Sequence, residues 1–377
     1  MLKIRIKERP HGLWVFKDTV KRTDKNLEPG SEVLVQYKNR ICGTGFANPA
    51  SAIIIRLYST RDERFTRQLL TARISDAFRF RRALGFTDSY RVVFGESDYL
   101  PGLIIDRYKS CFVLQTLSLG IAQRMPMVVD VLKRLFNPTL IYQKDNSPLR
   151  RLEGLKNEER VLWGKVPDEL WIKQDGIKFL VDIRNGQKTG YYLDQRINRQ
   201  QILKLSKDRS VLDLFTYNGS FALYAKKGGA KSVLGIDQSG LGIELAEKNG
   251  RANRLKCEFR KGEVFQFLKE HKENYDLIII DPPSFTRKKA DRENGLRGYL
   301  KLFMLACEHL NPYGIILLSS CSHYIFLRDL MNVVEQGSIK LRKIFRIFGI
   351  GHQAPDHPFL PGMSETEYLR CLFLQSS

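Results

Sequence analysis

Cysteines are few in this chain of 377 residues, and they are widely separated in the sequence. Zinc sites and disulfide frameworks need cysteines at short, regular spacings. The sequence therefore predicts no metal centre, and it indicates reduced thiols, as in a cytoplasm. The cysteines are Cys42, Cys111, Cys257, Cys307, Cys321 and Cys371.

Long apolar runs are also missing. No stretch reaches the roughly 20 apolar residues that a membrane-spanning helix requires. The first residues, Met1 to Glu8, lack the apolar core of a signal peptide. We therefore expect a cytoplasmic protein with no membrane partner. Because the chain is too long for one typical core, we expect two or three domains.

Acidic residues are scarce relative to basic ones. The 62 Lys and Arg against 41 Asp and Glu give a net charge of +21. Such an excess favours a polyanionic partner, most simply nucleic acid. A generally basic proteome or a solvated basic face would explain the same numbers.

The apolar pattern predicts three domains with different folds. Residues 1–70 contain short strand-like runs separated by turn residues, which is typical of a small β-barrel. Residues 71–176 alternate less regularly and indicate a central α+β domain, with a flexible loop expected at 147–164. Residues 177–377 alternate strands and helices, which indicates a Rossmann-like α/β domain with a mainly parallel sheet. Its first strands are predicted at 211–215, 232–237, 257–260, 276–280 and 314–320.

The barrel is rich in basic residues, so we expect it to grip RNA, although a purely structural cap is the alternative. These residues are Arg5, Lys7, Arg9, Lys17, Lys21, Arg22 and Lys25.

The first strand and turn of the α/β domain suggest a cofactor. Ligands of such sheets bind outside the carboxyl ends of the strands. The turn at Tyr217–Gly219 has a single glycine, Gly219, whereas loops that cradle a pyrophosphate need several. Asp213 also puts a negative charge in the strand. A nucleoside-like, cationic cofactor is therefore favoured, and S-adenosylmethionine (SAM) fits, although an ordinary strand–helix joint is the alternative.

Two more acids follow the next strands. Asp237 ends a buried strand about 20 residues beyond the first turn, where an acid can bond a ribose diol. Capping of the next helix is the alternative. Glu263 follows the third strand and could accept from the adenine amine, or it could be an ordinary acid at a helix N-terminus. Neighbouring residues complete the expected cofactor site: Phe215, Asn218, Gly219 and Gln238.

The fourth strand runs directly into Asp281-Pro282-Pro283-Ser-Phe285. The prolines hold the chain in an extended turn, which would fix Asp281 at the mouth of the sheet. We expect Asp281, Pro282 and Pro283 to grip a planar base, with Phe285 available for stacking.

The fifth strand ends at Cys321, whose polar neighbours mark a strand end that opens to a cleft. A thiolate there could add to C6 of cytosine and make C5 nucleophilic, with Asp281 near N3. Methylation of a base nitrogen would need the Asp-Pro-Pro turn but no thiol. A non-catalytic RNA-binding or ribosome-assembly protein is the alternative from another class. A dinucleotide-dependent oxidoreductase is less favoured, because the sequence lacks the glycine fingerprint of such enzymes.

The chain resembles the PUA-domain-containing class I RNA methyltransferases, in particular those that methylate cytosine C5 in large-subunit ribosomal RNA. The similarity extends over nearly the whole chain and lies in several motifs: His11–Phe16, Gly95–Asp106, Lys188–Arg196, Asp281–Phe285, Ser320–Ser322 and Asp356–Pro358.

The resemblance implies an N-terminal PUA domain, a SAM-binding C-terminal domain, a ribosomal RNA substrate and Cys321 as the nucleophile. It further implies that Gln195 and Arg196 border the cofactor. A homodimer is consistent with it, although no feature of the sequence indicates one. Two positions depart from the family: Glu263 stands where Asp is usual, and Asn218 where Thr is usual.

Overall fold

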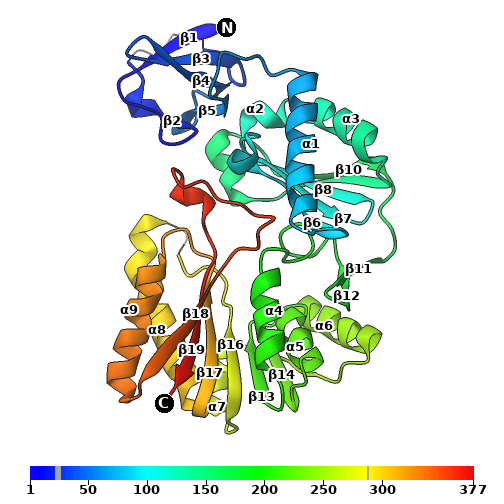
Figure 1. Ribbon diagram of the computed structural model, residues 1–377, viewed down its shortest axis with the longest axis vertical. Helices are drawn as coiled ribbons and strands as arrows, with labels where there is room; N and C mark the ends of the chain where they lie inside the picture. Colours follow the sequence, from blue (N-terminus) through cyan, green and yellow to red (C-terminus); the bar gives the residue numbers. More distant parts are fainter. Residues whose placement is uncertain (22–26, 287) are drawn as a thin grey trace. The chain divides into compact units, whose positions relative to one another are not determined.

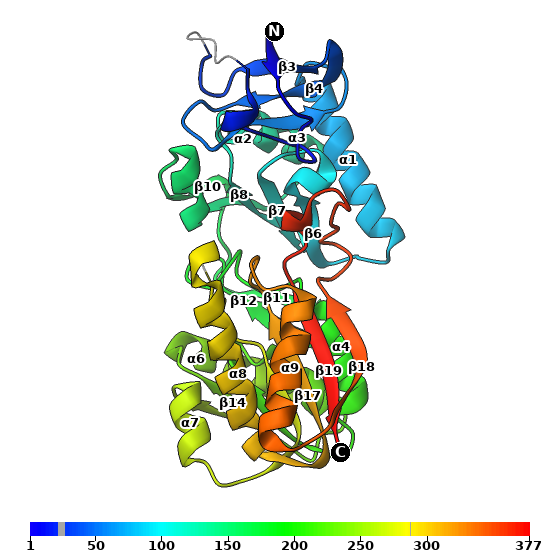
Figure 2. The ribbon, with the colours of Figure 1, turned by 90° about the vertical axis from the view of Figure 1, so that its left-hand side faces the viewer.

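The computed structural model describes residues 1–21, 27–286 and 288–377, so Arg22 and Lys25 lie outside the described residues. The chain forms two compact units (Figures 1 and 2). Unit 1 contains residues 1–172, 181–193 and 355–366, and unit 2 contains residues 173–180, 194–354 and 367–377. The domain boundaries at residues 70 and 176 stay predictions, because these units group the chain differently.

The N-terminal part of unit 1 is a five-stranded barrel-like sheet whose order is β1-β3-β4-β5-β2. The four strand-like runs of the sequence are confirmed as strands, and β1 was missed. Ile4 and Ile6 of β1 point into the core, while Lys3 and Arg5, which alternate with them, are exposed. The strands are β1 (Leu2–Ile6), β2 (Trp14–Phe16), β3 (Glu32–Tyr37), β4 (Arg40–Ala47) and β5 (Ile53–Ser59).

The central part of unit 1 is a second five-stranded sheet, in the order β10-β9-β8-β7-β6, with helices packed against it. Its elements are α1 (Arg67–Ala83), β6 (Ser89–Phe94), β7 (Leu103–Tyr108), β8 (Cys111–Thr116), α2 (Leu119–Ala122), α3 (Met125–Phe136), β9 (Leu140–Asp145) and β10 (Glu158–Gly164).

The flexible loop expected at 147–164 was wrong. Pro148–Glu153 forms a short 3-10 helix, and β10 pairs antiparallel with β9. The strand was missed because it is the edge of its sheet and most of its side chains are exposed. Its sequence therefore lacks the alternation of apolar and polar residues that marks a half-buried strand.

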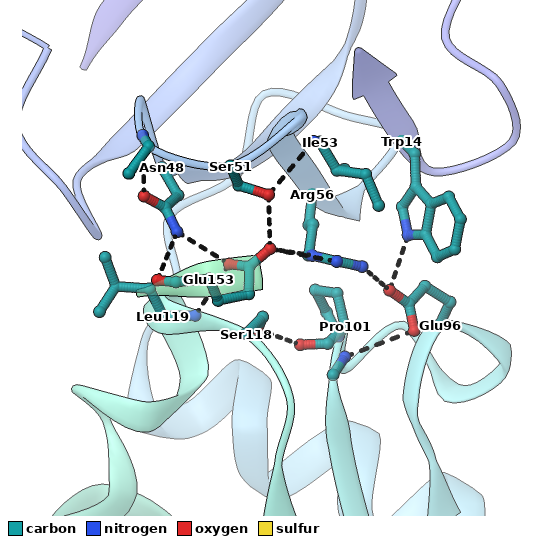
Figure 3. A network of polar contacts seen from close by, with 12 residues as sticks. Trp14, Asn48, Ser51, Ile53, Arg56, Glu96, Pro101, Ser118, Leu119 and Glu153 are labelled. Carbon is teal, nitrogen blue, oxygen red and sulfur yellow. Dashed lines mark hydrogen bonds and ion pairs between the residues drawn. The ribbon is translucent and has the colours of Figure 1, made fainter. Parts of the chain in front are cut away.

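A network of buried polar contacts joins the barrel to the central part of unit 1 (Figure 3). Glu153 is 3% exposed. Its carboxylate accepts hydrogen bonds from Asn48, Ser51 and Arg56 of the barrel. Arg56 also donates to Glu96 at 2.9 Å. The barrel and the central sheet are therefore held together by paired charges that are shielded from water.

Two segments that are distant in the sequence join unit 1 through buried charged groups. Thr189 donates to Asp106 at 2.6 Å, and Asp106 forms a bidentate pair with Arg91. The backbone amide of Arg91 in turn donates to Asp356. Residues 181–193 and 355–366 are thus fastened to the central sheet by side chains.

Unit 2 contains a seven-stranded sheet in the order β15-β14-β13-β16-β17-β19-β18. The first five strands in this order are parallel, whereas β19 runs antiparallel to β17 and β18. The predicted parallel sheet is confirmed, and its first strands begin and end within a few residues of the predicted positions. The strands are β13 (Ser210–Leu214), β14 (Ser232–Asp237), β15 (Glu258–Lys261), β16 (Tyr275–Ile280), β17 (Leu310–Ser320), β18 (Phe345–His352) and β19 (Arg370–Ser376).

Helices cover both faces of this sheet. Apolar residues of α4 and α5 pack with the strands in one cluster, and those of α7, α8 and α9 pack in another. A two-stranded sheet of β11 (Leu170–Gln174) and β12 (Ile177–Val181) precedes it. The helices are α4 (Arg196–Leu205), α5 (Ser220–Lys227), α6 (Gly240–Asn253), α7 (Val264–Glu270), α8 (Arg292–Glu308) and α9 (Leu327–Leu341).

Helices of the described residues are all too short or too polar to cross a membrane.

Candidate cofactor and target-base site

The loop after β13 has an unusual backbone. Phe215, Tyr217 and Gly219 all have positive φ, at 63°, 47° and 75°. Only glycine adopts this region without strain, so two of the three residues are held there by their surroundings. Asp237 does part of this, because its Oδ2 accepts from the Tyr217 amide at 2.9 Å. The predicted turn is confirmed, and it is tied to the end of β14.

Asp213 is 1% exposed and lies in β13, at the carboxyl end of the sheet. Its Oδ2 accepts from the Thr216 hydroxyl and from the Ala222 amide. Its Oδ1 is buried and has no hydrogen-bond partner. Burial, together with the nearby charges of Asp281 and Asp237, raises the pKa of Asp213 to about 7. A buried oxygen without a partner costs free energy, which a bound cation or donor would offset.

Asn218 supplies a donor in the same loop. Its Oδ1 accepts from the Ser220 hydroxyl, whereas its buried Nδ2 has no partner. The methionine part of SAM carries an ammonium group, which donates, and a carboxylate, which accepts. An acceptor on Asp213 and a donor on Asn218 therefore fit this group.

The other acids of the expected cofactor site are already hydrogen-bonded. Asp237 is buried, which raises its pKa, and its Oδ1 accepts from the Ser239 amide at 2.7 Å. Gln238 is exposed beside it. Glu263 caps α7: its two carboxylate oxygens accept from the Phe265 and Gln266 amides. This is the structural role that the sequence left open for Glu263, and its contact with adenine stays a prediction.

The Asp-Pro-Pro turn follows β16 directly and packs closely on α8. Asp281 is half-buried, Pro282 is buried and Pro283 is exposed. A Cβ on Gly295 of α8 would lie 2.2 Å from the Thr286 methyl carbon, so the helix backbone leaves room for this loop. The ring of Phe285 lies 4.8 Å from that of Tyr299. Phe285 therefore packs partly into the core, and its stacking on a target base stays a prediction.

Cys321 follows β17, which pairs with β16 as expected from the usual strand order. Its Sγ lies 3.9 Å from the Pro282 carbonyl oxygen. Next to it, the hydroxyls of Ser322 and Ser284 are 2.7 Å apart, so a hydrogen bond joins the two strand ends. Cys321 is partly exposed, and one side of it packs against aliphatic residues. The structure thus places the thiol beside the Asp-Pro-Pro turn.

The remaining cysteines are also free thiols, and Cys371 of β19 lies near Asp281 and Cys321. Burial raises the pKa of the Cys257 and Cys307 thiols to about 12. It also raises the pKa of Cys371. Cys111, Cys307 and Cys371 are buried, as expected, but Cys42 and Cys257 are only partly buried. Among the described residues, no cluster of three or more His, Cys, Asp or Glu could hold a metal ion.

Gln195 and Arg196 begin α4 and make different contacts. The Nε2 of Gln195 donates to Asp281 Oδ1 at 2.9 Å. Arg196 pairs with Asp175 at 2.9 Å. Asn198, which the sequence reasoning missed, donates to Gln195 Oε1. The i, i+3 spacing of Gln195 and Asn198 was the available signal, because such residues share one face of a helix.

Comparisons with known proteins agree with this geometry. A family model described as S-adenosylmethionine-dependent methyltransferase matches residues 155–329, and one described as a PUA-like domain matches residues 7–60. A ribosomal RNA large subunit methyltransferase I from Aliivibrio fischeri is 35% identical, and the alignment covers 95% of this chain and 93% of that protein. The protein of the same name from Pseudoalteromonas atlantica is 36% identical over 95% of this chain and 94% of its own.

The chain belongs to the ribosomal RNA large subunit methyltransferase I family. The predicted SAM-dependent methyltransferase, with SAM as its cofactor and a PUA-like N-terminal domain, is confirmed. The fold of this family member is also found in a protein from Streptococcus mutans described as a SAM-dependent methyltransferase. That structure matches with a TM-score of 0.84 and 20% identity over the whole of both chains. A methyltransferase solved with S-adenosylhomocysteine (SAH) matches with a TM-score of 0.85 and 21% identity, again over both whole chains.

Proposed function

We propose that this enzyme methylates C5 of a cytosine in large-subunit ribosomal RNA, with Cys321 as the nucleophile. The name of the relatives supports the substrate. The observation that carries the proposal is the Cys321 sulfur, 3.9 Å from the carbonyl oxygen of Pro282, the residue that follows Asp281. A methyltransferase that acts on a base nitrogen would have no need of a thiol at this place.

SAM would be held by the loop after β13 and by the end of β14. Asp213 Oδ1 offers an acceptor and Asn218 Nδ2 offers a donor, and both of these atoms are buried and have no hydrogen-bond partner. Asp237 at the end of β14 is proposed to bond the ribose. The bound cofactor supplies an electrophilic methyl group on its sulfonium sulfur.

Cys321 and Asp281 would then make C5 of cytosine reactive. The Cys321 thiolate forms a bond to C6, and the electron pair of the C5–C6 double bond shifts through the ring to N3. There Asp281 donates a proton, which leaves C5 nucleophilic. Once C5 carries the methyl group, loss of the C5 proton to a base restores the C5–C6 double bond. The C6–sulfur bond breaks, and N3 returns its proton to Asp281.

The test is the Cys321→Ala variant with Cys42→Ala as its control. We expect Cys321→Ala to lose all methyl transfer while it still binds SAM, because only the covalent step is removed. Cys42 lies in the barrel, so the Cys42→Ala variant should retain full activity. RNA that contains 5-fluorocytosine should form a stable covalent adduct with the wild-type enzyme and none with Cys321→Ala. Methylation by Cys321→Ala would refute the proposal and point to a base nitrogen as the target.

The basic barrel is proposed to bind the RNA. Its exposed cations include Arg5, Lys7 and Arg9. A cytoplasmic location follows from a ribosomal RNA substrate and is proposed with it. Homodimerisation stays a prediction.

A further inference from the structure

A chain of hydrogen bonds leads from β18 to the carboxylate of Asp281. Asn198 Nδ2 donates to the backbone carbonyl of His352 at 3.1 Å and to Gln195 Oε1 at 2.7 Å. Gln195 Nε2 then donates to Asp281 Oδ1 at 2.9 Å. Asn198 is 1% exposed and Gln195 is 3% exposed. Solvent therefore cannot replace these partners at low cost.

The direction of each bond in this chain is fixed by its first member. A backbone carbonyl only accepts, so Asn198 must present its amide nitrogen to His352. The same nitrogen lies 2.7 Å from Gln195 Oε1 and 3.3 Å from Cys371 Sγ. The oxygen of Gln195 is the nearer and stronger acceptor, so Gln195 turns its oxygen to Asn198. Gln195 is left with its NH₂ group facing Asp281. The backbone of β18 comes close enough that a Cβ on Gly351 would lie 2.2 Å from Asn198 Oδ1.

This arrangement determines how Asp281 can hold a proton. Oδ1 accepts from Gln195, and a carboxylic OH oxygen is a poor acceptor, so a proton on Asp281 is favoured on Oδ2. Other titratable groups also lie near Asp281, since it influences Asp213, Tyr299 and Cys371 electrostatically. The amide of Gln195 therefore marks Oδ1 as an accepting oxygen in a crowded site.

We propose that Gln195, oriented by Asn198, is a positioning residue that sets the Asp281 carboxyl group for proton transfer to the target base. This inference rests on the proposed function. The inference gives Gln195 a role other than the expected contact with SAM, because both ends of its amide are hydrogen-bonded, to Asn198 and to Asp281.

The first test is Gln195→Met, which keeps the length of the side chain and removes the donor. We expect methyl transfer at saturating SAM to slow roughly 10- to 100-fold, the range for a lost hydrogen bond to a charged group. The SAM dissociation constant, measured by calorimetry, should change by less than about threefold. Gln201→Met, partly exposed in the same helix, is the matched control and should behave as the wild type. A weakened SAM affinity with an unchanged rate at saturation would overturn the proposal and make Gln195 a cofactor residue.

The second test asks whether Asn198 acts through Gln195. Asn198→Ala frees Gln195 to turn its amide, so we expect a smaller loss of rate than in Gln195→Met. The double variant should be no slower than Gln195→Met alone, since residues of one network are not additive. Additive losses would contradict the proposal and assign Asn198 a separate structural role. The assay counts all methyl groups on the RNA, whichever atom carries them. If the wild-type enzyme methylates an atom other than cytosine C5, the proposed function is wrong, but the effect of Gln195→Met on the rate is still measured.

Discussion

Two buried polar clusters of this protein differ in how completely their atoms are hydrogen-bonded. At the junction of the barrel and the central sheet, both oxygens of Glu153 accept hydrogen bonds, and Glu96 accepts from Trp14 and Arg56 (Figure 3). At the carboxyl edge of the unit 2 sheet, Asp213 keeps a buried oxygen without a partner.

The difference separates a structural site from the proposed SAM site. A buried charge is tolerated when partners replace the water it has lost. The Glu153 cluster meets this condition by itself, so it needs no ligand. The Asp213 cluster does not, and its loop also contains strained residues. SAM can supply the missing partners. Removing the acid should therefore lower stability at Glu153, whereas at Asp213 it should raise stability and weaken SAM binding.

The largest effect is expected at the junction. Glu153→Ala leaves the Arg56 charge in a buried place with one of its two acid partners removed. We expect the free energy of unfolding to fall by about 3–5 kcal/mol, the range for breaking a buried ion pair. Urea denaturation measures this change.

Glu159→Ala is the control for that experiment. Glu159 is an exposed acid of β10, and its loss should change stability by no more than about 0.5 kcal/mol. Equal effects of the two variants would show that burial and pairing at Glu153 do not matter.

The second effect concerns Asp213→Asn, which keeps an oxygen for Thr216 and Ala222. The raised pKa of Asp213, about 7, means that its charge destabilises the folded state. The protonated form of Asp213 therefore contributes its full stability below the ordinary pKa of an aspartate. This contribution is lost as pH rises toward and through about 7. The variant should gain thermal stability relative to the wild type, and the gain should grow over that pH window.

SAM binding by the same variant should change in the opposite direction. We expect affinity to drop roughly 10- to 100-fold, as for a lost charged hydrogen bond. Wild-type affinity should also rise as pH increases through about 7, because the charged form binds the cation, whereas the variant should show no such rise. Calorimetry across this range measures both.

Asp276→Asn is the matched control on the neighbouring strand. For Asp276, hydrogen bonds from Ser210 and Asn311 outweigh the effect of burial and lower the pKa. The Asn variant should therefore lose stability at neutral pH and bind SAM normally. A loss of SAM affinity in this control would mean that Asp213→Asn acts through the sheet as a whole.

The smallest effect separates the two roles left open for Glu263. If Glu263 only caps α7, Glu263→Ala should cost about 1 kcal/mol of stability and leave SAM affinity unchanged. A tenfold weaker SAM affinity, by calorimetry, would instead support its contact with adenine.

Much of unit 2 could be predicted from the sequence because its signals are local. Buried strands such as Ile278–Ile280 are continuous apolar runs, and the turn residues after them stand next to them in the chain. Parallel strands bring their carboxyl ends to one edge, so Asp213 and Asp281 could be placed together before any coordinates. The edge strands β1 and β10 of unit 1 gave no such signal and were missed.

Local residue patterns were enough to predict the alternation of strands and helices in unit 2, the acids and thiol at the strand ends, and the basic character of the barrel. Three facts emerged only from the folded chain: Gln195 donates to Asp281, Glu263 caps α7, and residues 355–366 belong to unit 1. These facts depend on which groups meet after the chain has folded. Residues far apart in the chain become hydrogen-bond partners only through packing, and no local pattern of residue types encodes that choice.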